Sequence, residues 1–119
     1  MTYLTETFQG LFKRRIQVKK FYKFLLVPNT SCAYDYRMMN NLGIAFSRYG
    51  HQFVVSPSTE SEYIIKYFEY QPDVIIAVNK FRPIDGRLKR DVIFLSWFQD
   101  VYPETSGCLY FESNDKFLM

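Results

Sequence analysis

Two short motifs carry most of the side chains in this sequence that could do chemistry. The first is Asn79-Lys80-Phe81-Arg82-Pro83, and the second is Trp97-Phe98-Gln99-Asp100. Asn, Lys and Arg together can hold a hydroxylated or anionic ligand through charge-assisted hydrogen bonds. A carboxylate such as that of Asp100 can act as a general base on an acceptor hydroxyl, or can orient that hydroxyl. The same residues also suit a solvated loop with one capping Asn and, for Asp100, a cap on the next turn of the chain.

Each motif comes directly after an apolar run that predicts a strand, over 73–78 and over 92–97. A run that is apolar on both faces is typical of a strand buried on both sides in a parallel sheet. In open α/β sheets, ligands bind at the carboxyl ends of such strands. We therefore expect Asn79, Arg82, Gln99 and Asp100 to share one edge of the sheet.

The rest of the chain alternates strands and helices. Further strands are expected at 23–27 and 51–55, and helices at about 34–49 and from a Thr-x-x-Glu capping box at 59–62 to about 70. A short fifth strand is expected at 107–111, and no element over 114–119. This pattern predicts a three-layer, Rossmann-like α/β fold, an open parallel sheet of four to five strands with helices on both faces. The first strand should be central, with the second outside it and the third and fourth on its other side.

The loop after the first strand, Pro28-Asn29-Thr30-Ser31-Cys32, contains no glycine. Dinucleotide-binding loops and P-loops need glycines where the backbone approaches phosphate, so both classes are disfavoured. Asn29 and Thr30 could still bind a sugar hydroxyl, or could only cap the helix. A receiver domain would need an acidic cluster here, and a flavodoxin a loop that also contains glycine.

Length and charge further limit the number of domains and the functional classes to which the protein can belong. The 119 residues suffice for one domain, which we place at 20–119 after a basic leader at 1–19. A net charge of +3 is too small to indicate nucleic acid binding. The basic residues do crowd toward the start of the chain. That region is interpreted as a solvated leader, or alternatively as a patch for peripheral membrane contact through anionic head groups.

Neither a metal nor a cofactor is expected. His51 is the single histidine, and Cys32 and Cys108 have no metal-ligand spacing. No apolar run is long enough to cross a bilayer, and the first ten residues lack signal-peptide order, so a cytoplasmic location is expected. Aromatic residues make up 19% of the chain, which indicates either a large aromatic core or a face that a partner covers.

Three segments of the sequence, PDVIIAVNKFRP, VIFLSWFQDVYP and LGIAFSRYGHQFVV, carry a family resemblance. Together they resemble the N-terminal, Rossmann-like half of glycosyltransferases of the two-domain GT-B architecture, nearest to the bacterial spore-maturation-type and related enzymes. The likeness covers about residues 20–119. It implies transfer of a sugar from a nucleotide-sugar donor to an acceptor held by this half, without a bound metal. It also implies that Asn79, Arg82 and Asp100 face the cleft between the domains, with Asp100 as the candidate base.

The sequence departs from that family in one respect, because a GT-B enzyme holds its nucleotide-sugar donor in a second domain that these 119 residues do not contain. We therefore expect no activity from this chain alone. The alternative is a non-catalytic α/β interaction module that forms a homodimer, or docks on a larger protein partner, through its aromatic surface.

Overall fold

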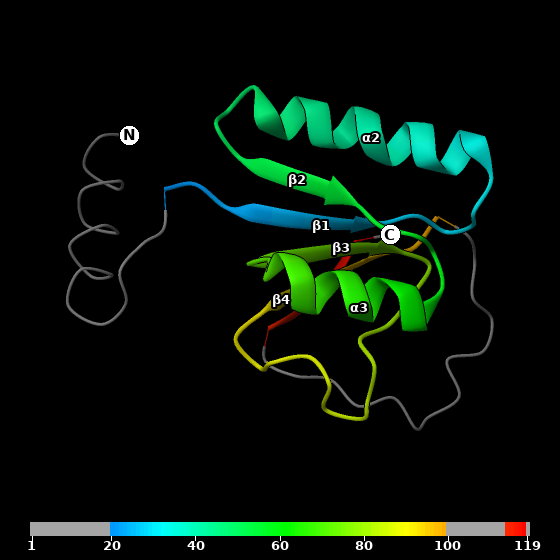
Figure 1. Cartoon of the computed structure of the whole chain (residues 1–119), viewed down its shortest axis with the longest axis vertical. Helices are drawn as coiled ribbons and strands as arrows, with labels where there is room; N and C mark the ends of the chain where they lie inside the picture. Colours follow the sequence, from blue (N-terminus) through cyan, green and yellow to red (C-terminus); the bar gives the residue numbers. More distant parts are fainter. Residues whose placement is uncertain (1–19, 100–113, 119) are drawn as a thin grey trace.

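The computed structural model describes residues 20–99 and 114–118, which form a five-stranded sheet with a helix on each face (Figure 1). The strands are β1 (Lys23–Val27), β2 (Gln52–Val55), β3 (Val74–Val78), β4 (Ile93–Trp97) and β5 (Asp115–Leu118). The helices are α2 (Ala33–Ser47) and α3 (Glu60–Tyr70). The strand order is β2-β1-β3-β4-β5, and every neighbouring pair is parallel. The predicted Rossmann-like α/β fold and the central place of the first strand are confirmed.

β1 and β3 lie inside the sheet, and their sequences explain why. β3 is buried at all five positions, and Leu25, Leu26 and Val27 of β1 have no exposed surface. In register, Leu25 lies beside Val54 of β2 and Ile75 of β3. Apolar residues on both faces of these strands need a cover on each side, and the two helices provide it.

The two faces of the sheet belong to two separate apolar clusters. On one face, α2 packs over Leu26, Ile76 and Val78 through Met39 and its neighbours. On the other face, α3 and the segment 80–92 cover the side chains of β1, β3 and β4 that point to that side. The residues of that second cluster are Leu25, Val27, Tyr63, Ile64, Tyr67, Ile75, Ala77, Leu88, Val92 and Phe94.

Two glycines shape α2: Gly43 allows its close approach to β2, and Gly50 forms the turn that ends it. A Cβ at Gly43 would overlap the ring of Phe53, which explains a glycine inside the helix by close packing of helix on sheet. At the end of α2, the His51 N–H donates to the Phe46 carbonyl at 3.3 Å and the Gly50 N–H to the Ser47 carbonyl at 3.0 Å. This is a Schellman arrangement, with Gly50 at φ 91° in the position that favours glycine.

α3 begins at a Thr59 N-cap and ends before Gln71, which adopts the left-handed conformation at φ 53°. The expected capping box is only partly formed. The Thr59 hydroxyl donates to the Glu62 carboxylate at 2.7 Å, and no side chain caps the backbone of the first turn. Beyond Gln71, the buried Pro72 turns the chain into β3.

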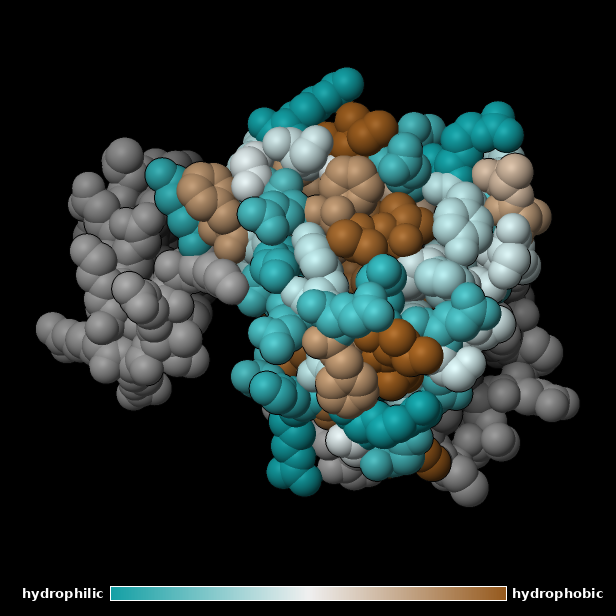
Figure 2. Space-filling view, in the orientation of Figure 1, coloured by the Kyte–Doolittle hydropathy of each residue, from teal (hydrophilic) through white to brown (hydrophobic). Residues whose placement is uncertain are grey.

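Hydrophobic side chains also gather at the surface over α3, as Figure 2 shows. Ile65 and Phe68 lie one helical turn apart and are 59% and 56% exposed. None of the helices in the described part of the chain is long and apolar enough to cross a membrane.

The carboxyl-terminal end of the chain differs from the expectation. The prediction that 114–119 forms no element is wrong, because Asp115–Leu118 is the edge strand β5. The expected strand at 107–111 and the basic leader at 1–19 lie outside the described residues. Of the basic residues near the start, Lys20 and Lys23 are described. The Lys20 ammonium lies over the ring of Phe21, and the Lys23 ammonium donates to the Tyr70 carbonyl at 2.6 Å.

Candidate functional site

The loops after β1, β2, β3 and β4 meet at the carboxyl edge of the sheet, because all four strands point the same way. The connections on either side of β1 diverge there. α2 crosses from β1 to β2 on one face, and α3 crosses from β2 to β3 on the other (Figure 1). Such a reversal between β1 and β3 is the position at which open α/β sheets bind ligands.

Lys80 bridges this reversal. It follows β3, and its ammonium donates to the backbone carbonyl of Asn29, in the loop after β1, at 3.0 Å. Burial lowers the pKa of Lys80 from its usual value, and the nearby Asp35 carboxylate partly opposes that effect. One hydrogen bond leaves two ammonium hydrogens for other acceptors.

Asn79 connects β3 to β4. Its N–H donates to the Trp97 carbonyl at 2.8 Å, and its side-chain oxygen accepts from the Gln99 N–H, also at 2.8 Å. The backbone of Asn79 is left-handed, at φ 57°, which Asn tolerates better than most residues. The structure thus brings Asn79 and Gln99 together, and this oxygen of Asn79 is already engaged with the protein.

Thr30 is fully occupied by local hydrogen bonds. Its N–H and hydroxyl donate to Asp35 at 3.1 and 2.5 Å, and its hydroxyl oxygen accepts from the Cys32 N–H at 3.2 Å. These bonds from Thr30 are the main reason why the pKa of Asp35 lies below its ordinary value. Thr30 therefore organises the loop before α2, although no side chain caps the backbone of the first turn of this helix.

A further contact at this edge joins the loops after β1 and β2. The hydroxyls of Ser31 and Ser58 lie 3.0 Å apart, and Ser58 is buried. The motif after β3 includes Lys80, but neither Lys80 nor Ser58 is among the individual residues predicted to bind a substrate. The reasoning that selects Asn79, namely a polar residue just after a strand, applies equally to Lys80 and to the Ser56-Pro57-Ser58 turn.

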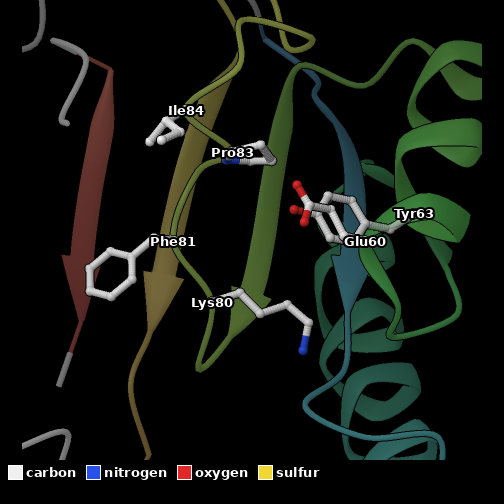
Figure 3. Close-up of a pocket in the computed structure, with 6 residues that line it drawn as sticks. All are labelled: Glu60, Tyr63, Lys80, Phe81, Pro83 and Ile84. Carbon is white, nitrogen blue, oxygen red and sulfur yellow. The ribbon is translucent and has the colours of Figure 1, made fainter. Parts of the chain in front are cut away.

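Arg82 lies away from the carboxyl edge. Its guanidinium donates to Asp115 and to the carbonyls of Lys89 and Val92, at 3.1 and 2.6 Å for the two carbonyls. Those partners surround the amino ends of β4 and β5. After Asn79 the chain turns back along the sheet, as the positions of Lys80 and Pro83 in Figure 3 show. The structure therefore does not bring Arg82 together with Asn79.

Asp100, the expected base, lies outside the described residues, next to the described Gln99. The Gln99 side chain donates to the sulfur of Met38 at 3.4 Å. Asn29 is partly exposed at the end of β1. His51 lies at the opposite edge, where its Nδ1 accepts from the Tyr22 N–H at 3.1 Å, a structural role.

No group of three or more His, Cys, Asp or Glu side chains within 20–99 and 114–118 is placed to hold a metal ion. The carboxyl edge can instead offer hydrogen bonds, from the Lys80 ammonium and from the side chains of Asn29 and Ser31. Such groups bind hydroxyls and anionic oxygens. Comparison of the sequence with protein families and with curated proteins finds no match.

Proposed function

We propose that this domain is the acceptor-side half of a GT-B-type glycosyltransferase. In this proposal the carboxyl edge holds a sugar acceptor, and a second domain holds the nucleotide-sugar donor. The observation that supports it best is the bridge from Lys80 to Asn29 across the reversal between β1 and β3. That bridge leaves a polar, preorganised edge at the place where Rossmann-like sheets bind ligands.

Within this proposal the residues have separate roles. Asn29 and Lys80 contact the acceptor, Asn79 and Gln99 fix the ends of β3 and β4, and Asp100 removes or orients the proton of the acceptor hydroxyl. Thr30 sets the loop that carries Asn29. Arg82 stabilises the domain from the other end of the sheet. The chemistry follows from positioning and proton transfer, without a metal ion.

Amide NMR of the isotopically labelled chain tests the binding half of the proposal. We expect monosaccharide acceptors to shift the amide signals of Asn29, Lys80 and Gln99, and nucleotide sugars to leave them unchanged. Lys80→Met should abolish the shifts, while Lys66→Met, a substitution on the outer side of α3, should not. Shifts confined to the amino edge around His51 would contradict the proposal.

The catalytic half is tested when a donor-binding domain is supplied. Asp100→Asn should then reduce turnover by about 100-fold or more, as for loss of a general base, while the melting temperature stays the same. Near-normal turnover by this variant would remove Asp100 from the mechanism.

The exposed Ile65 and Phe68 on α3 support a second candidate, a non-catalytic module that forms a homodimer through this helix. A stable dimer buries roughly 1,200–2,000 Å² in total. Light scattering over a range of concentrations should then show a dimer that Phe68→Glu converts to a monomer. A wild-type chain that is monomeric throughout would exclude this candidate.

A further inference from the structure

A cavity of about 380 Å³ lies on the α3 face of the sheet and reaches Lys80 at the carboxyl edge. Its walls come from two elements (Figure 3). α3 contributes Glu60 and Tyr63, and the segment that turns back after β3 contributes Lys80, Phe81, Pro83 and Ile84. A volume of this size is at the lower end of the range for small-molecule sites and suits a single ring with substituents.

Tyr63 is the feature that points to a ligand. It is only 2% exposed, yet its hydroxyl has no hydrogen-bond partner among the described residues. Tyr67, one turn further along α3, shows the usual solution, because its hydroxyl accepts from the Lys89 N–H at 3.0 Å. Within the described residues, no side-chain oxygen or nitrogen that is completely buried lacks a partner. The small open surface of Tyr63 therefore includes its hydroxyl, at the wall of the cavity.

A hydroxyl in this position favours a bound partner. A polar group that is largely withdrawn from water and not bonded to the protein is costly unless an ordered water or a ligand satisfies it. Burial raises the pKa of Tyr63, so the hydroxyl keeps its proton and can donate as well as accept.

The polar groups of the cavity occupy two positions along it. The oxygens of Glu60 and Tyr63 lie close together opposite Pro83, whereas the Lys80 amine lies nearer the carboxyl end of β3 (Figure 3). One Glu60 oxygen accepts from Arg87 at 2.5 Å, which holds the carboxylate in place. A ligand hydroxyl at the first position could donate to Glu60 and accept from Tyr63. An anionic group at the second position would meet the ammonium of Lys80.

The remaining wall is apolar. Pro83 and Ile84 present carbon surface, and Ile84 is 70% exposed at the rim, whereas the ring of Phe81 is turned toward β5 and packs on Phe98 and Phe117 (Figure 3). A six-membered ring can pack one face on such a wall while its substituents reach the polar groups. The hydroxyl position at Glu60 and Tyr63, the anion position at Lys80 and the apolar wall together favour one kind of ligand.

We propose that this cavity binds a six-membered ring that carries a carboxylate at one end and a hydroxyl at the other. Two sources share this chemistry, a hydroxylated aromatic acid and a hexuronic acid. Lys80 is shared with the carboxyl edge, but Tyr63 and Glu60 take no part in that edge, so the proposal does not depend on sugar transfer there.

Four probes, added to the labelled full chain, separate the elements of the proposal: 4-hydroxybenzoate, benzoate, glucuronate and glucose. We expect at least one of the two hydroxy acids to give saturable amide shifts at Tyr63, Phe81 and Ile84. Its analogue without the hydroxyl or the carboxylate should bind about five-fold more weakly or worse, the effect of losing one hydrogen bond. Which hydroxy acid binds more tightly identifies the source.

Two variants test the residues. Tyr63→Phe should weaken binding about five-fold without lowering the melting temperature, because the lost hydroxyl has no partner among the described residues. Lys80→Met should weaken binding about ten-fold or more through loss of a charged donor. Tyr36→Phe and Lys66→Met are the matched controls and should bind like the wild type.

The proposal is overturned if neither hydroxy acid gives saturable shifts, or if Tyr63→Phe binds the better one as tightly as the wild type does. Should Tyr63→Phe fail to fold, Glu60→Met, which removes the proposed acceptor of the ligand hydroxyl and leaves the carboxyl edge intact, decides in the same way. Shifts confined to Asn29 and Gln99 would place the acid at the carboxyl edge, which contradicts the cavity site and supports the edge site.

Discussion

At the scale of single residues, protonation of the Asp35 carboxyl affects the stability of the loop after β1. Its pKa is lowered, first by the Thr30 hydroxyl and then by further hydrogen bonds and the charge of Lys80. A carboxyl whose pKa is lower in the folded than in the unfolded protein stabilises the fold at pH values above its unfolded pKa, here 3.8. That contribution is lost as the pH falls through the folded pKa.

We expect Thr30→Ala to raise the pKa of Asp35 toward 3.8, because the largest cause of the shift is removed. Titration of the side-chain carboxyl carbon by NMR measures this directly. Thr59→Ala, which alters a hydroxyl at the start of the other helix, should leave the pKa of Asp35 unchanged. An unchanged value in Thr30→Ala would show that the Thr30 hydroxyl is not the main cause of the lowered pKa.

Arg82 and Asp115 form a buried ion pair, with side chains 4% and 3% exposed. Removing one partner of such a pair leaves the other charge buried, so Arg82→Met should lower the free energy of unfolding by about 3–5 kcal/mol. Urea unfolding gives the value. Arg87→Met breaks exposed pairs with Glu60 and Asp85 and should cost no more than about 1 kcal/mol. Equal costs for the two variants would refute the structural role of Arg82.

The placement of Arg82 shows why a site is harder to predict than a strand. Its type and its position three residues after Asn79 favour a ligand at the carboxyl edge. The left-handed backbone of Asn79 sends the chain back over the sheet, and this reversal puts the guanidinium at the opposite end. Asn79 and Gln99 do come together as expected, since the carboxyl ends of neighbouring parallel strands meet whatever course the chain takes afterwards.

At the scale of elements, Gly43 sets how closely α2 approaches β2. Replacement of a helix-interior glycine by alanine normally stabilises by up to about 1 kcal/mol. Here the added methyl group would collide with the ring of Phe53, so we expect Gly43→Ala to destabilise by about 1–3 kcal/mol.

Denaturant unfolding of Gly43→Ala checks this, with Asn41→Ala as the control at an exposed position of the same helix. The control should be neutral or slightly stabilising. The double variant with Phe53→Leu should recover part of the loss if the clash with the ring is its cause. A Gly43→Ala chain more stable than the wild type would mean that the helix is free to move away from the sheet.

Strands with a local signal were easier to predict than the strand without one. β1, β3 and β4 are apolar runs with clear boundaries, such as Pro28 after β1 and Pro72 before β3, and their local pattern fixes both type and position. β5 has the sequence Asp-Lys-Phe-Leu, which shows no such pattern. Its stability comes from pairing with β4 and from the ion pair with Arg82, and neither contact is local in sequence.

At the scale of the whole molecule, the edge strand β5 makes a testable contribution. Deleting residues 114–119 removes both the β4–β5 pairing and the charge that faces Arg82. We expect the shortened chain to lose at least about 3 kcal/mol of stability, measured by urea unfolding, and adding Arg82→Met to it should restore part of that loss. Deletion of Met119 alone is the control. A shortened chain as stable as the wild type would show that β5 does not contribute to the stability of the sheet.

The central position of β1 also has a consequence in time. Leu25 pairs with Val54 and Ile75, which come about thirty and fifty positions later in the chain. On a ribosome, β1 therefore emerges long before either neighbour and must wait, its apolar residues unshielded, until β3 has left the exit tunnel. Topologies with such distant pairings fold slowly and are vulnerable to aggregation in the interval. Chaperones that bind short apolar segments would therefore find in β1 a target that stays open through much of synthesis.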